Sequence, residues 1–565
     1  MPRPKKIKPT ASILEAAPSS DAANMQPITV AWSLAELPSP QHRAGLAGLV
    51  MLVEFTKRHQ IPEGAVLEMT RLDDIGCEVR MNMAGLKALM DQTYDADREE
   101  IEVPRPWMKK QKDGTKVEVP PKRRGMKTTI DKKGKSKESE FCVYDTVVPR
   151  GGPLGEWVPS EDGGRWIKLW RDWLWNTLRA IPKQRTPYIQ RAGADVAVDG
   201  DEAGDEDAKD VTTAWNCLTR DAPAKLASTY YLGAMDVNAE NVSFQDQGRF
   251  LFLLHFWSFA IHLFIPQHLT AKGEHKPDGF VTCIPDVARL KDFITRHEHV
   301  LRGRSPDAAG FRPRQAIIDL ADAAALEIER WLENAVTSGV KQRDAPATAG
   351  FQIVHVEKES NSVRIRSNRI VIPTREKIDR SHILSDCWSH LIKHQVLINV
   401  LAEHPWWNGF DRVCATYGKD FTIKNTKFRH DARILFNHFN PEDRSMSDQT
   451  PQSPRSLEQL ILRMVTSWLS GRLESKYKLS WNTVKKGTPD EADYEEKKTK
   501  LATQAFLAAR SRPGREFARW FTATLCSVNQ RSISSEADFV ALAQALDEQP
   551  DHVRSLTLLA LSARG

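Results

Sequence analysis

Residues Phe351–Pro373 read FQIVHVEKESNSVRIRSNRIVIP, and this stretch decides the fold class. Apolar and polar side chains alternate in its first run and again from Val363, and a Ser-Asn pair separates the two runs. A period of two is typical of a half-buried strand, so the stretch predicts a β-hairpin. In the second strand Arg364 and Arg366 share one face, which makes them candidates for contact with nucleic acid.

The pattern changes on the C-terminal side of this hairpin. Residues 441–456 hold a single aliphatic or aromatic residue, Met446, and predict a linker. From Leu457 to Leu561 apolar residues recur at intervals of three and four, as in LEQLILRMVTSWLSGRL. The sequence therefore predicts an all-α C-terminal helical bundle over residues 457–565.

On the N-terminal side, residues 27–440 mix the two periods. They predict a large domain of helices and short antiparallel strands, so the fold class of the chain is α+β. The run GLAGLVMLVEF from Gly45 predicts an apolar helix, in which Gly45 and Gly48 permit the close approach of another backbone. Residues 1–26, rich in Pro, Ala and Ser, predict a disordered tail.

The composition is that of a soluble globular protein. Of 565 residues, 41% are hydrophobic and 27% are charged, which argues against disorder of the whole chain, collagen-like repeats and a membrane protein. The longest apolar run, Phe250–Ile265, contains polar residues and is shorter than the ~20 residues that a bilayer requires, so it predicts a buried core helix. Seven scattered cysteines without a CxxC pair indicate reduced thiols in a cytoplasmic protein.

The formal net charge of +6 is a sum of opposed blocks. Residues 105–138 carry thirteen Lys or Arg against four Asp or Glu, and predict a long exposed basic loop or a hairpin. Residues 195–210 carry eight acids against one lysine and predict a solvated acidic linker. Neutralised phosphates release counterions, so the basic block is a candidate phosphate clamp on duplex DNA.

Other cations lie on predicted helices and turns. The Arg150-Gly151-Gly152 turn would allow close approach to a DNA groove. All candidate nucleic-acid contacts are Lys109, Lys110, Lys122, Arg123, Arg124, Lys127, Lys132, Lys133, Arg150, Gly151, Gly152, Lys168, Arg171, Arg364, Arg366, Lys424, Lys427 and Arg429.

The sequence offers little catalytic chemistry. It contains no phosphate-binding loop of the GxxxxGK[ST] kind, and no GxGxxG follows a predicted strand. Two metal hypotheses stay open for a nucleic-acid hydrolase: the His430-Asp431 dipeptide, and the group His382, Cys387, His390 and His394. In both cases a structural role for the residues is the alternative, and we predict neither a catalytic residue nor a cofactor.

Five long segments carry a family resemblance. They are LPSPQHRAGLAGLV (37–50), PRGGPLGEW with WIKLWRDWLWNTLRAIP (149–182), YLGAMDVNAENVSFQDQGRFLFLLHFW (231–257), FQIVHVEKESNSVRI (351–365) and HPWWNGFDRV with KFRHDAR (404–433). Together they resemble the large subunit of the type I CRISPR effector complex, Cascade, of the Myxan subtype.

The resemblance implies a non-catalytic subunit of a crRNA-guided antiviral complex. Such a subunit binds target double-stranded DNA, recognises the protospacer-adjacent motif, assists R-loop formation and provides a docking surface for a helicase-nuclease or for transposition factors. Its implied partners are crRNA, both DNA strands, and the backbone and 5′-handle-binding subunits, with or without separate small subunits, and no membrane. Residues 457–565 are similar to those small subunits.

Overall fold

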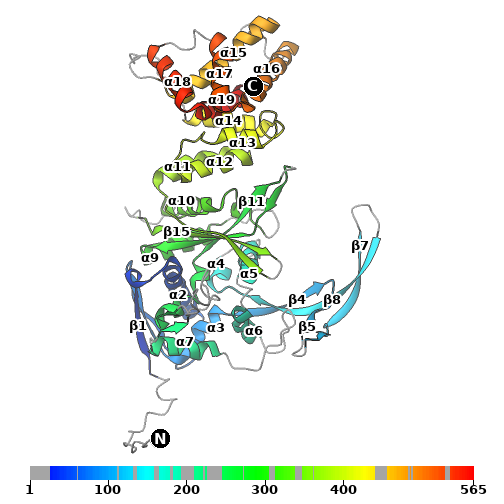
Figure 1. Ribbon diagram of the computed structural model, residues 1–565. Helices are drawn as coiled ribbons and strands as arrows, with labels where there is room; N and C mark the ends of the chain where they lie inside the picture. Colours follow the sequence, from blue (N-terminus) through cyan, green and yellow to red (C-terminus); the bar gives the residue numbers. More distant parts are fainter. Residues whose placement is uncertain are drawn as a thin grey trace, which may run out of the picture. The chain divides into compact units, whose positions relative to one another are not determined.

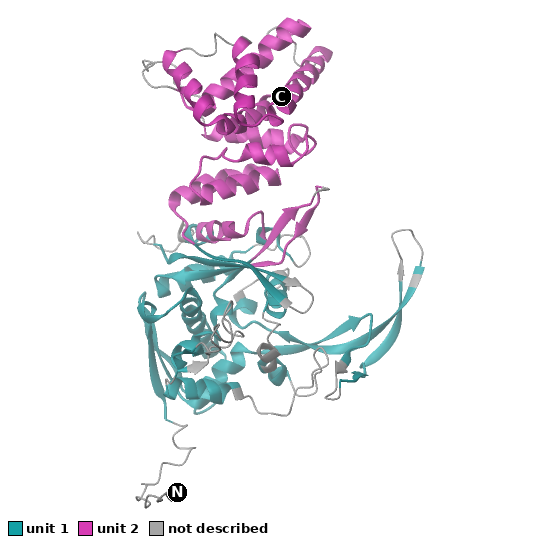
Figure 2. Cartoon of the chain, viewed as in Figure 1, with its two compact units in different colours: residues 1–263, 282–316, 331–370 teal, residues 264–281, 317–330, 371–565 magenta. Residues whose placement is uncertain are grey.

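The computed structural model describes residues 26–59, 61–110, 114–130, 136–157, 164–177, 182–192, 209–220, 223–225, 245–270, 273–304, 312–337, 346–359, 362–439, 455–481, 484, 488–528 and 535–565. Lys132, Lys133, nearly all of the predicted tail and linker, and the acidic segment up to residue 208 lie outside the described residues. Two compact units divide the chain (Figure 2). Unit 1 comprises residues 1–263, 282–316 and 331–370, and unit 2 comprises residues 264–281, 317–330 and 371–565. The predicted division at 441–456 stays a prediction.

The fold is α+β, as the sequence predicts. Unit 1 contains a three-stranded antiparallel sheet in the order β1 (Ile28–Ser33), β3 (Gly76–Met81) and β2 (Leu67–Leu72). Helices α2 (Pro40–Arg58) and α3 (Met83–Thr93) pack against each other. Ser39 caps α2, because its side chain accepts a hydrogen bond from the backbone N–H of His42.

Two glycines of α2 allow the chain around α8 (Gly248–Leu253) to lie directly against the helix. A Cβ on Gly45 would lie 2.4 Å from the carbonyl oxygen of Leu253, and a Cβ on Gly48 would lie 2.1 Å from that of Phe256. Side-chain carbons do not approach a backbone oxygen this closely. The predicted role of these glycines in close backbone approach is therefore confirmed.

The predicted core helix over Phe250–Ile265 is wrong in its second half. Helix α8 ends at Leu253, a 3-10 turn η2 occupies Trp257–Phe259, and strand β11 (His262–Leu269) follows. The first five residues of β11 are buried, so both faces of the strand are covered and no alternation is visible in the sequence. Periodicity alone does not distinguish such a strand from a buried helix.

The central sheet has six strands, in the order β12 (His275–Pro277), β11, β13 (Phe280–Val287), β15 (Thr348–Glu359) and β16 (Ser362–Val371), with β14 (Ile317–Ile318) paired to β11. Strands β11 and β13 each contribute residues to both units. The predicted hairpin is β15 and β16, which are neighbours in the sheet. Strand β16 forms an edge of this sheet.

The described residues of the basic segment, 105–110, 114–130 and 136–138, belong to an extended antiparallel structure (Figure 1). Strands β4 (Ala96–Val103), β8 (Ser136–Pro149) and β7 (Arg123–Ile130) form a sheet in that order, which we call the charged ribbon. Strands β5 (Met108–Lys110) and β6 (Lys116–Glu118) pair beside it. Of the two predicted alternatives, the hairpin is therefore confirmed, since β7 and β8 are antiparallel neighbours.

The other helices and 3-10 turns described in unit 1 are η1 (Leu34–Glu36), α4 (Pro153–Trp157), α5 (Gly164–Thr177), α6 (Pro182–Ala192), α7 (Lys209–Arg220), α9 (Leu290–Arg302), η3 (Arg314–Ala316) and α10 (Ala324–Thr337), of which α10 contributes residues to both units. Strands β9 (Ala224–Lys225) and β10 (Gln245–Asp246) form a short antiparallel pair. The tryptophans of α5 face the core. Trp170 Nε1 donates to the Ser258 carbonyl at 2.9 Å, and Trp173 Nε1 donates to Thr282 Oγ1 at 2.8 Å. The buried N–H groups of Trp170 and Trp173 are thus paired, whereas Trp166 Nε1 has no hydrogen-bond partner among the described residues.

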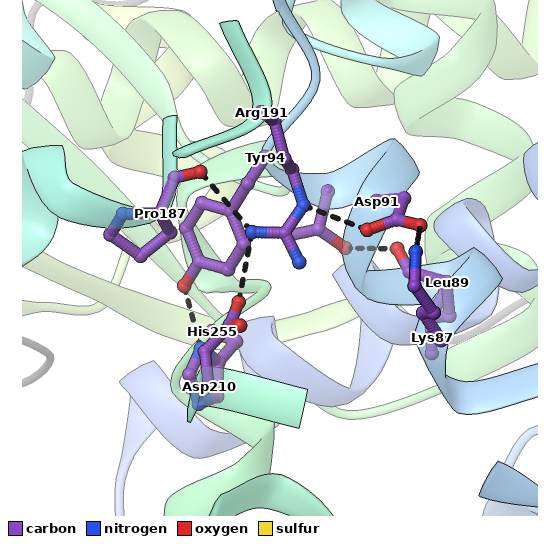
Figure 3. Close-up of polar contacts among 9 residues, drawn as sticks. Lys87, Leu89, Asp91, Tyr94, Pro187, Arg191, Asp210 and His255 are labelled. Carbon is purple, nitrogen blue, oxygen red and sulfur yellow. Dashed lines mark hydrogen bonds and ion pairs between the residues drawn. The ribbon is translucent and has the colours of Figure 1, made fainter. Parts of the chain in front are cut away.

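A buried polar network joins α3, α6 and α7 (Figure 3). Arg191 on α6 lies 2.9 Å from Asp91 and 3.0 Å from Asp210, and its guanidinium lies over the Tyr94 ring. The Tyr94 hydroxyl lies 2.6 Å from His255 Nδ1. Asp210, the last residue of the predicted solvated linker, is therefore part of a buried ion pair. For this residue the prediction is wrong, because its partner Arg191 lies on another helix.

His255 makes the stability of unit 1 dependent on pH. Burial lowers the pKa of His255 from 6.5 to about 4, and the nearby Asp210 only partly opposes this. The unfolded chain therefore binds the proton first, and the free energy of unfolding should fall as the pH drops from 6.5 towards 4, by up to ~1.4 kcal/mol per pH unit. Urea denaturation at pH 7, 6 and 5 measures this slope. His255→Gln should flatten the slope, and equal slopes for both proteins would contradict the assignment.

Unit 2 is helical beyond its strands. Its 3-10 turns are η4 (Ala321–Ala323), η5 (Ile383–Asp386) and η6 (Cys526–Val528), and its helices are α11 (Arg375–His382), α12 (His390–Leu401), α13 (Phe410–Thr416), α14 (Thr426–Phe439), α15 (Leu457–Tyr477), α16 (Pro489–Arg510), α17 (Gly514–Thr524), α18 (Glu536–Glu548) and α19 (Pro550–Arg564). Helix α19 is buried from Val553 to Ala563. It packs against α13 to α18, so the C-terminal helix is the centre of the core.

Candidate nucleic-acid interface

Lys122, just before β7, and the cations of β7 are exposed, but each has an acidic partner across the charged ribbon. Lys122 Nζ lies 3.0 Å from Glu100 and 3.2 Å from Asp145, and these two acids raise the pKa of Lys122. Lys127 Nζ lies 2.9 Å from Glu102. The sequence contains few acids close to these lysines, so it predicts unmatched cations. That premise is wrong, because antiparallel pairing places β4 and β8 beside them.

The two arginines of this cluster are paired as well. Arg123 lies 3.7 Å from Glu100, and Arg124 pairs with Glu118 and lies 3.8 Å from Glu140. Both guanidinium groups stay at least half exposed. Exposed ion pairs are worth about 0–1 kcal/mol, so a phosphate could replace each acid at small cost. Lys109 and Lys110 lie on β5, opposite Val117 and Lys116.

The Arg150-Gly151-Gly152 turn connects β8 to α4; the Arg150 side chain is exposed, whereas Gly151 is buried. Arg150 pairs with Asp95 at 3.0 Å and also with Asp97, and its hydrogen bonds lower the pKa of Asp97. Both glycines have positive φ, 83° and 48°, which favours glycine. A Cβ on Gly151 would lie 2.6 Å from the Ile167 side chain. The glycines therefore serve a turn packed against the core, while Arg150 remains exposed, and contact of this turn with DNA stays a prediction.

Of the two predicted DNA contacts on α5, Lys168 is accessible to a ligand and Arg171 has a structural role. Lys168 is exposed, and no described acid lies within ion-pair distance of it. Arg171 is partly buried, its Nε donates to the Pro149 carbonyl at 2.5 Å, and burial lowers its pKa. Lys168 is thus the member of this pair that can reach a phosphate.

In strand β16 charged and apolar residues alternate, but the apolar residues are not all buried. Arg364 and Arg366 are exposed, and Arg366 Nε donates to Glu357 on β15 at 2.7 Å. Ile365, on the opposite face, is 39% exposed. Both faces of this part of the edge strand therefore meet solvent.

The third predicted patch lies around the start of α14. Lys424 is exposed and lies 3.9 Å from Asp420, whereas Lys427 is exposed with no described acid at ion-pair distance. Arg429 is partly buried, and burial lowers its pKa. Phe428 is fully buried, so it cannot stack on a base.

Neither metal hypothesis gains a ligand set. Asp431 is buried and its Oδ2 accepts hydrogen bonds from the backbone N–H groups of Trp388 at 2.7 Å and Ser389 at 2.5 Å. This carboxylate therefore holds the start of α12, which is a structural role. Among the residues that the structure describes, no three His, Cys, Asp or Glu side chains are grouped so as to hold a metal ion.

The four residues of the second metal hypothesis have separate partners, although two of the histidine rings stack on each other. His390 Nδ1 lies 2.6 Å from Asp319, and the His390 and His394 rings stack at 5.7 Å. The Cys387 thiol instead donates to the Ile383 carbonyl, and burial raises its pKa to about 12. His382 is exposed at the end of α11. The described contacts of these four side chains are therefore structural and do not form a set of metal ligands.

Two family models match consecutive parts of the chain. Residues 66–342 match the type I-B CRISPR Cas8b N-terminal domain, and residues 348–564 match the type I-B CRISPR Cas8b C-terminal domain. The chain belongs to the type I-B Cas8b family. It is thus the large subunit of a type I CRISPR complex, which works with other Cascade components and crRNA. The models name type I-B and leave the Myxan subtype without support. No curated protein matches the chain.

This Cas8b also exposes an aromatic side chain that the sequence did not single out. Trp388 is 62% exposed and its ring stacks on His430, with centroids 4.7 Å apart and planes inclined by 19°. The two residues lie more than forty positions apart, and Trp388 precedes α12 instead of belonging to its periodic face. The only sequence signal was a tryptophan beside the capping residue of a helix.

No described helix of this chain is long and apolar enough to cross a membrane.

Proposed function

We propose that this Cas8b binds target double-stranded DNA in the bacterial cytoplasm, recognises the motif adjacent to the target, assists R-loop formation and provides a docking surface for a helicase-nuclease or transposition factors. In this proposal it performs no catalysis itself. The observation that carries it is the match of two consecutive Cas8b domain models over nearly the whole chain. In such systems the guide RNA reads the sequence by base pairing, and protein supplies phosphate contacts, shape and the adjacent motif.

The charged ribbon supports the DNA-binding part of the proposal. Its cations are exposed and held in weak surface pairs, so DNA phosphates can compete with the acids of β4 and β8. Lys168, also in unit 1, is a further exposed cation without a described acidic partner. A surface of this kind binds duplex DNA without sequence preference, and its affinity depends on salt because each phosphate contact releases counterions.

The first test replaces Lys122, Arg123, Arg124 and Lys127 with Ala in the assembled complex. The acids of β4 and β8 then lose their partners and repel phosphate, so duplex affinity should fall at least tenfold for all sequences. The slope of log affinity against log salt should become shallower by about three to four. Fluorescence anisotropy with labelled duplexes over a NaCl series measures both quantities.

The matched control removes the acids instead. The variant Glu100→Gln with Glu102→Gln frees Lys127 from its ribbon partner and leaves Lys122 with Asp145 alone, so it should bind duplex more tightly than the natural chain. If both variants bound DNA as the natural complex does, with the same salt slope, the ribbon would have no role in DNA binding.

A further inference from the structure

The indole ring of Trp388 is a flat apolar group that is exposed to solvent. At 62% exposure it is the most exposed tryptophan among the residues that the structure describes. Its backbone N–H donates to the buried Asp431, as does that of Ser389, so the segment before α12 is anchored to α14. Exposure of so large a ring costs free energy unless something covers it.

The neighbouring His430 gives this surface its geometry. The near-parallel stack with centroids 4.7 Å apart covers one face of the indole. With more than half of the side chain exposed, the opposite face remains open to a planar partner. The two stacked side chains lie on rigid elements that Asp431 joins. Binding of a partner ring would therefore cost the protein little conformational entropy.

The charges nearby favour an anionic partner. Lys427 lies one turn before His430 on α14, is exposed, and has no described acid within ion-pair distance. The exposed acid in the same segment is Asp386, which faces Ser385 at 3.5 Å. An aromatic face beside an exposed lysine is a combination that binds bases and phosphates of single strands.

We propose that Trp388 and His430 form a stacking site for an unpaired base of single-stranded DNA, with Lys427 contacting an adjacent phosphate. The inference rests on the proposed function, since opening of the target duplex supplies the unpaired strand. Stacking is tolerant of sequence because every base has a flat face. The site would therefore hold opened DNA and would not read the adjacent motif.

The test uses the assembled complex with crRNA and two DNA substrates. One is a fully paired target duplex, and the other carries a preformed bubble with 2-aminopurine in the unpaired strand. Trp388→Ala should weaken binding of the bubbled substrate about tenfold and should raise 2-aminopurine fluorescence by loss of stacking. Trp388→Phe should retain most of the affinity. Trp481→Ala, at a tryptophan 45% exposed in the same unit, should have no effect.

The outcomes separate the inference from the function on which it rests. If Trp388→Ala bound the bubbled substrate as the natural complex does, the stacking site would be refuted and DNA binding would stand. If the natural complex bound neither substrate, the proposed function would fail and the inference with it. If Trp388→Ala kept its DNA affinity and lost recruitment of the helicase-nuclease, the surface would be a protein docking site, which also overturns the inference. Melting curves of all variants check that the fold is retained.

Discussion

Replacement of Arg191 by Met should destabilise unit 1 by about 3–5 kcal/mol, because it leaves a buried charge without a partner. The side chains of Arg191 and Asp210 are 9% and 8% exposed, and their atoms lie 3.0 Å apart. Asp91, the second partner of Arg191, is more exposed and can be solvated by water. The loss of stability in Arg191→Met therefore comes mainly from the unpaired buried charge of Asp210. Because Arg191 joins α6 and α7 to α3, its loss should loosen these helices first (Figure 3).

Urea denaturation with hydrogen exchange measured by mass spectrometry tests this expectation. Peptides from α3, α6 and α7 should exchange much faster in Arg191→Met, while peptides from α19 in unit 2 should not change. The double variant Arg191→Met with Asp210→Asn removes both charges and should recover more than half of the loss. A single variant as stable as the natural protein would show that water already reaches this ion pair.

Replacement of Gly48 by Ala should destabilise unit 1 by about 3 kcal/mol, although helix propensity alone predicts the opposite sign. Ala is better than Gly inside a helix by roughly 1 kcal/mol, and α2 is a regular helix of nineteen residues. The added Cβ would, however, lie 2.1 Å from the Phe256 carbonyl oxygen. That atom belongs to the backbone, so it cannot move aside as a flexible side chain would.

The control is Gly418→Ala, at a position where an added Cβ meets no atom within 4 Å. Thermal melting should show a lower melting temperature for Gly48→Ala than for the natural protein. The melting temperature of Gly418→Ala should be unchanged. Gly45→Ala should behave as Gly48→Ala does, since its Cβ would lie 2.4 Å from the Leu253 carbonyl oxygen. If Gly48→Ala raised the melting temperature, the intimate contact of α2 with the chain around α8 would be refuted.

The candidate interface shows where charge patterns mislead. Counted along the chain, residues 105–138 are strongly basic, and this much the sequence predicts correctly. Counted in space, Glu100 and Glu102 precede this segment in the chain, while Asp145 follows it, and all three lie beside its lysines. The hairpin could be predicted, but its third strand could not. The potential at the ribbon surface is therefore weaker than the linear count indicates.

The tryptophans of α5 and the single Trp388 illustrate the same division. The spacing of Trp166, Trp170 and Trp173 predicts one buried face of a helix, and all three are buried. Trp388 lies outside any periodic run, so no local pattern could indicate its exposure. Its environment depends on His430 and Asp431, which reach it from another helix.

The sequence by itself determined the α+β class, the β15–β16 hairpin, the helical C-terminal region and the glycines of α2, because each of these is written in local periodicity or residue size. It also carried the family, since long segments retain their order. Only the tertiary structure decided that β11 is a strand, that the ribbon cations are paired and that Trp388 faces solvent. These features depend on contacts between residues far apart in the chain, and such contacts leave no signal in local sequence.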